Sequence, residues 1–240
     1  MREKSARLMA ALGAGIGVAA LTLQLSLMLA RFYDRGDTAL AGLWRFLGFF
    51  TNVSNLFAVL VLAHAALRPK ARTGLGAPRI EAAATAAIIM AGILNSALLA
   101  GRFNPQGLYK LADLALHDMV PFAVALFWLL RPHGELRLED ALFSVSWPLL
   151  YCVYALMRGV ADGWYPYYFL DPAILGLTGL ATNIVLLGAA FLAAAYILVG
   201  IDRLLGTGLS GRRPSAGSLL RDRTAAAFAG LEEGDSQGGG

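Results

Sequence analysis

The chain has 240 residues, of which 58% are hydrophobic and 15% charged, and its mean hydropathy is +0.61. This composition excludes an ordinary soluble domain, in which charged residues make up roughly a quarter of the chain. The formal net charge is +4, but the basic residues stand in short clusters between apolar blocks, where they suit lipid headgroups, so no nucleic-acid partner is expected.

Apolar blocks follow one another along the chain, each about as long as the ~20 residues that a helix needs to cross a bilayer. They predict an all-α fold, a bundle of about six transmembrane helices, with five as the fallback because the fifth block contains Pro148. The first block is longer than a signal peptide's apolar region and lacks a small-residue cleavage site, so it is interpreted as an uncleaved helix. The predicted spans are residues 8–30, 44–67, 82–100, 112–131, 141–159 and 173–201.

Lys and Arg are distributed unevenly over the connections between these spans. Fourteen of the 20 lie in the N-terminal segment, in the 68–81 and 131–140 loops, and after residue 201. The positive-inside rule therefore places both termini in the cytoplasm, which requires an even number of spans. The chain from residue 203 is rich in Gly, Ser and Arg, so we expect a transmembrane domain over 1–202 and a disordered cytoplasmic tail over 203–240.

Two further features of the spans and loops leave alternatives open. The outer loop after the fifth span is aromatic, from Trp164 to Phe169, and suits either an interfacial anchor or a lid over a site. Glycines four or three residues apart, at 13 and 17 in the first span and at 176 and 179 in the last, would let helices approach closely.

Polar residues collect at one depth of the predicted bundle. Because alternate helices run in opposite directions, residues late in the odd spans and early in the even spans share the outer leaflet. Four helices thus bring polar groups to a similar level, which predicts a polar pocket opening toward the outer face. The residues of this set are Gln24, Thr51, Asn52, Ser54, Asn55, Asn95, Ser96, His117, Asp118, Tyr154 and Arg158.

Thr51 and His117 are the candidate catalytic residues of this pocket. Imidazole exchanges a proton near neutral pH, and a hydroxyl becomes a useful nucleophile only beside such a base. The alternatives are a His that bonds only to a neighbouring helix and a Thr that bonds to its own upstream carbonyl. Pro121, four residues after His117, is expected to kink the helix and free the His117 carbonyl. Asp118 lies nearly a third of a turn round and is expected to point elsewhere.

Other residues are candidates for binding a substrate. Asn55 or Asn95 could donate to an oxyanion. On the fifth span, Tyr151, Tyr154 and Arg158 continue a stripe that begins at Trp147 and faces one neighbour. Arg158 at its outer end could bind a carboxylate or extend to lipid headgroups.

Four segments carry a resemblance to a known family: Phe49–Leu56 with the sequence FFTNVSNL, Leu116–Phe122 with LHDMVPF, Trp147-Pro148-x-x-Tyr151, and Tyr165-Pro166-Tyr167. Together they resemble the androgen-induced integral membrane protein family and its bacterial six-helix relatives, over about residues 8–200.

The animal members of this family are threonine hydrolases that split fatty acid esters of hydroxy fatty acids. For this chain, the resemblance implies the same kind of activity, with Thr51 as the nucleophile and His117 as the base. It also implies the inner membrane of a bacterium. The interval between the two residues is shorter here than in the animal members and their flanks differ, which leaves the substrate more open than the fold.

Three functions are therefore weighed. The first is an intramembrane lipid-ester hydrolase acting on a membrane lipid or fatty acid ester, with neither cofactor nor metal. The second is a small-molecule or ion transporter, against which stand the apolar inner halves and the lack of repeats. The third is a non-catalytic lipid-binding protein.

Several other chemistries lose support from the sequence. Cys152 is the only cysteine, which excludes an internal disulfide and a thiolate-rich metal site. The three histidines, His64, His117 and His133, are too far apart in the predicted topology to flank one haem. Zinc-protease, Gly-x-Ser-x-Gly and phosphate-loop motifs do not occur.

Overall fold

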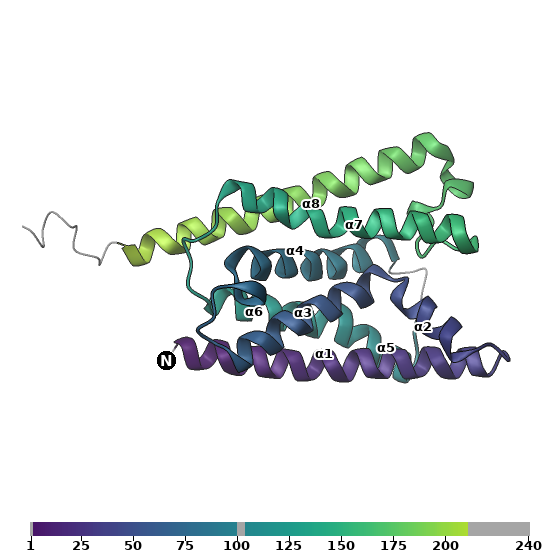
Figure 1. Ribbon diagram of the computed structural model, residues 1–240, viewed down its shortest axis with the longest axis horizontal. Helices are drawn as coiled ribbons and strands as arrows, with labels where there is room; N and C mark the ends of the chain where they lie inside the picture. The colour runs from purple at the N-terminus through teal and green to yellow at the C-terminus, as the bar shows by residue number, and fades with distance from the viewer. Residues whose placement is uncertain (1, 100–103, 211–240) are drawn as a thin grey trace, which may run out of the picture.

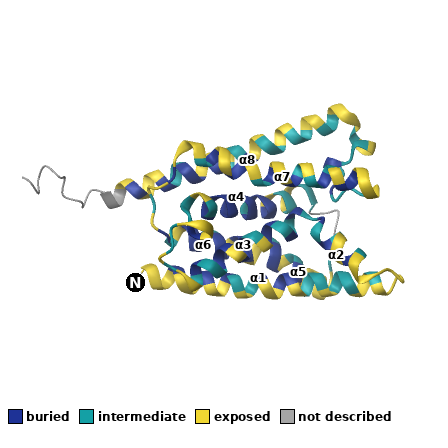
Figure 2. Cartoon of the chain, viewed as in Figure 1, coloured by how far each residue is buried: buried dark blue, intermediate teal, exposed yellow. Residues whose placement is uncertain are grey.

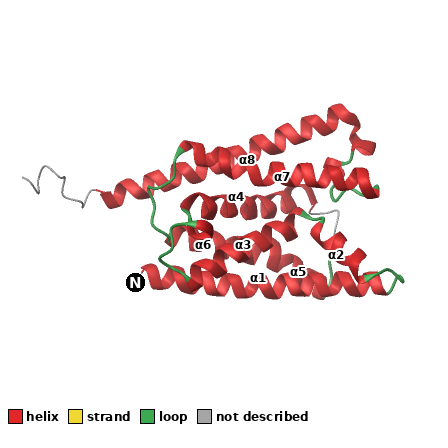
Figure 3. Ribbon diagram, viewed as in Figure 1, coloured by secondary structure: helices red, strands yellow, loops and turns green. Residues whose placement is uncertain are grey.

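The computed structural model describes residues 2–99 and 104–210, which are helices joined by short loops (Figure 3). This part of the chain contains no strand, so the predicted all-α class is confirmed. The eight α-helices are α1 (Arg2–Tyr33), α2 (Ala39–Leu47), α3 (Phe50–Leu67), α4 (Pro78–Leu94), α5 (Leu108–Leu114), α6 (Val120–Leu130), α7 (Leu138–Asp162) and α8 (Pro172–Ser210).

Six helical segments of the described chain are long and apolar enough to cross a membrane, which supports an integral membrane protein. The fifth is continuous through Pro148, so the five-span fallback is not needed. Large apolar side chains are exposed along the outside of the bundle, where lipid would cover them. The segments are Arg2–Tyr33, Phe50–Leu67, Pro78–Leu99, Leu108–Leu130, Leu138–Asp162 and Pro172–Thr207.

Several boundaries differ from the sequence prediction, and α1 already begins at Arg2, six residues before the predicted start. The predicted span 44–67 begins inside α2 and crosses a break at Gly48 and Phe49, so α3 starts only at Phe50. The last helix continues to Ser210, past residue 202 where the domain boundary was placed. The predicted tail from residue 211 onward lies outside the described residues.

The helices lie side by side with α4 in the middle of the bundle (Figure 1). α4 packs against α3, α6, α7 and α8. α1 lies at one edge of the bundle, where it packs against α3 and α6. The central position suits α4 because it is rich in alanine, whose small side chain lets helices approach from all sides. Figure 2 shows α4 as the most uniformly buried helix. Its fully enclosed alanines are Ala82, Ala83, Ala84, Ala86, Ala87 and Ala91.

The two predicted glycine pairs have different outcomes. A Cβ at Gly13 would lie 2.9 Å from Leu62, and one at Gly17 would collide with Val59, so this pair does let α1 approach α3 closely. Gly176 instead has φ +66° and kinks the start of α8, with no neighbour within 4 Å of a Cβ. The last helix therefore uses this glycine for a change of direction.

The N-terminus and the far end of α8 lie at the same end of the bundle (Figure 1). A buried ion pair, Glu81 with Arg131, and a buried hydrogen bond, His133 with Asp202, hold the loops at this end. Glu81 Oε1 lies 2.8 Å from Arg131 Nη2, and Asp202 Oδ1 lies 3.1 Å from His133 Nδ1. The opposite end carries the α2–α3 corner and the aromatic loop before α8, and the polar residues singled out in the sequence lie toward it.

Candidate active site

The site begins with two π-helical turns, Asn95–Leu99 at the end of α4 and Ala115–Met119 between α5 and α6. Pro121 has no N–H to donate to the carbonyl of His117, and the N–H of Val120 reaches back five residues to Ala115. The expected kink therefore takes the form of a widened turn. Such π turns occur frequently at functional sites because they re-aim side chains.

Thr51 and His117 meet between α3 and this turn, as the sequence predicted. Thr51 Oγ1 lies 3.1 Å from His117 Nε2. On the other side of the ring, Nδ1 lies 2.9 Å from Asp113 Oδ1 and 3.1 Å from the Asp113 carbonyl oxygen. Since both of these oxygens accept hydrogen bonds, the proton belongs on Nδ1. Nε2 is then free to accept the proton of the Thr51 hydroxyl.

Asp113 is a candidate site residue that the sequence prediction missed. It precedes His117 by four residues, a spacing that places two helical side chains on one face, so the signal was present. Asp118 lines a groove on the outside of α6 together with His117, but the carboxylate that contacts the imidazole is that of Asp113. Thr51, His117 and Asp113 thus form a hydroxyl–imidazole–carboxylate series, the arrangement that activates a nucleophile.

Gly92 makes this approach of helices possible. A Cβ at this position would lie 2.6 Å from the carbonyl oxygen of His117 and would push the π turn away from α4. The absence of a side chain at Gly92 therefore helps to fix the depth at which His117 reaches Thr51.

Tyr167 contributes a further hydroxyl to the site. It is buried, it lines the same cavity as Thr51, and it lies close to Thr51 and the start of α3. Burial raises the pKa of Tyr167 above its ordinary value, so the hydroxyl keeps its proton and remains a donor at neutral pH. The aromatic loop is therefore a wall of the site as well as a candidate anchor.

The two asparagines proposed as oxyanion donors have different surroundings. The Asn55 amide nitrogen donates to the carbonyls of Thr51 at 2.9 Å and Leu116 at 3.2 Å, so both of its protons are engaged in joining α3 to the His117 turn. The Asn95 side chain lines the same cavity as Thr51 and has no hydrogen-bond partner among the described residues. Of the two, Asn95 is the one whose amide is free of partners within residues 2–99 and 104–210.

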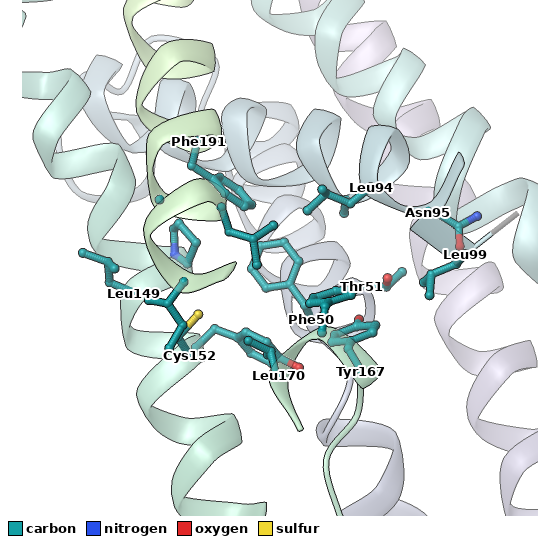
Figure 4. A pocket seen from close by; sticks show the side chains of 17 residues that line it. Phe50, Thr51, Leu94, Asn95, Leu99, Leu149, Cys152, Tyr167, Leu170 and Phe191 are labelled. Carbon is teal, nitrogen blue, oxygen red and sulfur yellow. The ribbon is translucent and has the colours of Figure 1, made fainter. Parts of the chain in front are cut away.

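A partly enclosed cavity adjoins Thr51, with about 600 Å³ of space free of protein atoms, its open side included. Figure 4 shows Thr51, Asn95 and Tyr167 on one side of it and Leu149, Cys152 and Phe191 on the other. The remaining walls come from α4, α7, α8 and the loop before α8, and are almost entirely apolar. The cavity suits a hydrocarbon chain whose polar end reaches Thr51.

The predicted stripe on the fifth span faces the α2–α3 corner. The Tyr151 hydroxyl donates to the Gly48 carbonyl at 2.8 Å, and the Tyr154 hydroxyl donates to the Leu47 carbonyl at 3.2 Å. Trp147 Nε1 donates to Ser54 Oγ at 3.1 Å. These bonds hold in place the corner from which α3 and its Thr51 begin. Tyr151 also lines the cavity, whereas Tyr154 does not.

Arg158 is buried and does not extend to the surface. Its guanidinium stacks on Trp44, with Cζ 3.9 Å from the ring centroid, donates to Tyr154 and lies 3.5 Å from Asp162. It does not line the cavity beside Thr51. The structure therefore places Arg158 in an aromatic cluster next to the site.

No family model, no curated protein and no solved structure matches this chain. Among the described residues, no group of three or more His, Cys, Asp or Glu side chains could hold a metal ion.

Proposed function

We propose that the protein is an intramembrane lipid-ester hydrolase with Thr51 as its nucleophile. The observation that carries this proposal is the alignment of Thr51, His117 and Asp113, with distances of 3.1 Å and 2.9 Å, beside an apolar cavity. A lone Thr in a membrane helix commonly bonds to its own helix, as Thr182 does with the Thr178 carbonyl. Thr51 instead donates to a base from another helix.

The reaction would proceed through an acyl-enzyme. His117 Nε2 takes the proton of the Thr51 hydroxyl while Oγ1 attacks the ester carbonyl, and the proton then passes to the leaving alcohol. Water afterwards attacks the acyl-Thr51 carbonyl and gives its proton to His117, and Thr51 leaves with that proton as the fatty acid forms. Asp113 keeps the imidazole in the required tautomer and stabilises the imidazolium.

The negative charge that develops on the carbonyl oxygen would be met by neutral donors. Tyr167 lies close to Thr51 and the first turn of α3, and the Asn95 amide faces the same cavity. A phenol beside a helix N-terminus lies in the positive field of that helix end and becomes a better donor to an oxyanion. Tyr167 would act beside Asn95, one of the two asparagines that the sequence offered for this role.

The substrate class follows from the cavity and from the family resemblance. An apolar cavity bordered by lipid-facing helices favours a fatty acid ester, including the esters of hydroxy fatty acids that the resemblance implies. The basic clusters favour cytoplasmic termini, which would put the site toward the outer leaflet, and the resemblance implies a bacterial inner membrane. The chemistry needs no cofactor.

The test is turnover by purified protein in nanodiscs with a labelled fatty acid ester of a hydroxy fatty acid. Thr51→Ala and His117→Ala are expected to lose most activity, by about 10³-fold or more, because a nucleophile and its base act as a unit. Thr182→Ala is the matched control, since it removes a membrane threonine that bonds only to its own helix. Full turnover by both site variants would remove the proposal.

A fluorophosphonate probe gives a second measurement of the same proposal. It is expected to label Thr51 in the native protein and in Thr182→Ala, and to leave Thr51→Ala unlabelled. Substrate flux across proteoliposomes, without ester turnover, would instead favour a transporter.

A further inference from the structure

The catalytic series can be reached from two sides of α4. Ala91, Leu94 and Asn95 are three and four residues apart and line the apolar cavity beside Thr51. Gly92, Ile93 and Ser96 lie on the opposite face of the helix and line a separate, wide groove. His117, Asp118 and Phe122 form the other wall of that groove. Thr51 thus borders the cavity, and its base borders the groove.

The groove differs from the cavity in its chemistry. Asp118 and Ser96 are both exposed, and no described residue hydrogen-bonds to either side chain. Both belong to π-helical turns at a level where the neighbouring surface is apolar. A carboxylate or hydroxyl left facing hydrocarbon without a partner is strongly disfavoured. Asp118 and Ser96 on the walls of the groove therefore favour water entering from the nearby end of the bundle.

We propose that this groove is the water entrance of the catalytic centre, used when the acyl-enzyme is hydrolysed. The inference rests on the proposed function, because it assigns a route to the second substrate of that reaction. During this step the acyl chain fills the apolar cavity, so water cannot arrive by the same path. From the groove it reaches the imidazole, which is 12% exposed.

The step at the end of this route balances without any further reactant. Water transfers one proton to His117 Nε2 as its oxygen bonds to the acyl carbon. The tetrahedral intermediate then expels Thr51 Oγ1, which recovers that proton from His117. The products are the free acid and the original hydroxyl, and the groove supplies only water.

Ser96→Trp tests the route by filling the groove. Ser96 is exposed, so the larger side chain has space and the bundle should still fold. The matched control is Ser146→Trp, which adds the same side chain at an exposed position of α7, away from both cavity and groove. The measurement is the decay of pre-formed acyl-Thr51, followed by intact mass after rapid mixing, together with the burst of released alcohol.

For Ser96→Trp we expect the burst to match the native protein, while acyl-Thr51 decays about tenfold more slowly, a change of about 1.4 kcal/mol in the barrier. Asp118→Leu, which removes the groove's charge without filling it, should also slow decay. Native decay rates in both variants would overturn the water route while leaving the hydrolase intact. The absence of any acyl-Thr51 in the native protein would instead contradict the proposed function.

Discussion

The carboxylate of Asp113 lies 2.9 Å from Nδ1 of His117, four residues later in the same helical segment. This contact sets the direction in which the imidazole is polarised, because the opposite nitrogen, Nε2, faces the Thr51 hydroxyl at 3.1 Å. The side chain of Asp113 is 40% exposed, so the pair does not bury an isolated charge. In the proposed mechanism, one helical segment would therefore provide both the base and the group that orients it, and a second helix would provide the nucleophile.

Asp113→Asn is expected to lower kcat by about 10²–10⁴ with little change in KM, because an amide can hold the imidazole in the wrong tautomer while leaving its position intact. Ester turnover in nanodiscs over a range of substrate concentrations measures the effect. Asp34→Asn, in the exposed turn after α1, is the control and should keep native rates. Equal rates for the two variants would show that Asp113 has no part in the reaction.

Tyr167→Phe is expected to lower kcat by about 10²–10³ if the phenol stabilises the oxyanion, since removing one such donor has an effect of this size. The Phe ring keeps the packing against Phe49 and Phe169, so the fold should persist. Tyr168→Phe changes the adjacent tyrosine, which does not line the cavity, and is the matched control. A fall of the same size in both variants would point to a structural role for the loop.

Much of this architecture could be predicted from the sequence because the bilayer imposes long apolar blocks on the chain. The meeting of Thr51 with His117 also followed from depth, since both residues lie in the first half of spans that run in the same direction. Asn95 was placed in the same pocket by the same argument, and it lines the cavity.

The remaining features depend on contacts that depth alone does not specify. The break before Phe50 interrupts a continuous apolar run, because Asn52 donates to the Phe46 carbonyl at 2.8 Å and ties the two helices into a corner. The two π turns alter which side chains share a face of the helix. Of these turns, only the one at Ala115–Met119 had a signal in the sequence, namely Pro121. Tyr167 was recognised as part of an aromatic loop, but its burial against Thr51 depends on how that loop folds inward.

Gly92→Ala should reduce activity without unfolding the protein. The new methyl group would lie 2.6 Å from the His117 carbonyl oxygen, which is backbone and cannot rotate away, so the turn that carries the imidazole must shift. A displacement of this kind typically lowers kcat by about 10²-fold. Gly15→Ala is the control, because nothing lies within 4 Å of its Cβ. Thermal unfolding of both variants separates a moved base from a destabilised bundle, and native turnover in Gly92→Ala would contradict the assigned spacing.

Cys152 provides a built-in probe of where the hydrocarbon chain binds. It is the only cysteine of the chain, and its side chain lines the apolar end of the cavity with Leu149 and Leu187. A dodecyl methanethiosulfonate should form a mixed disulfide there, place its alkyl chain in the cavity and lower ester turnover at least tenfold. Cys152→Ser should keep native activity and resist the reagent, and a bound fatty acid should slow the modification in the native protein. Intact mass gives the extent of modification beside each rate. Complete modification of Cys152 with unchanged turnover would mean that the acyl chain lies elsewhere, because a cavity filled by the probe could not then be the substrate's binding site.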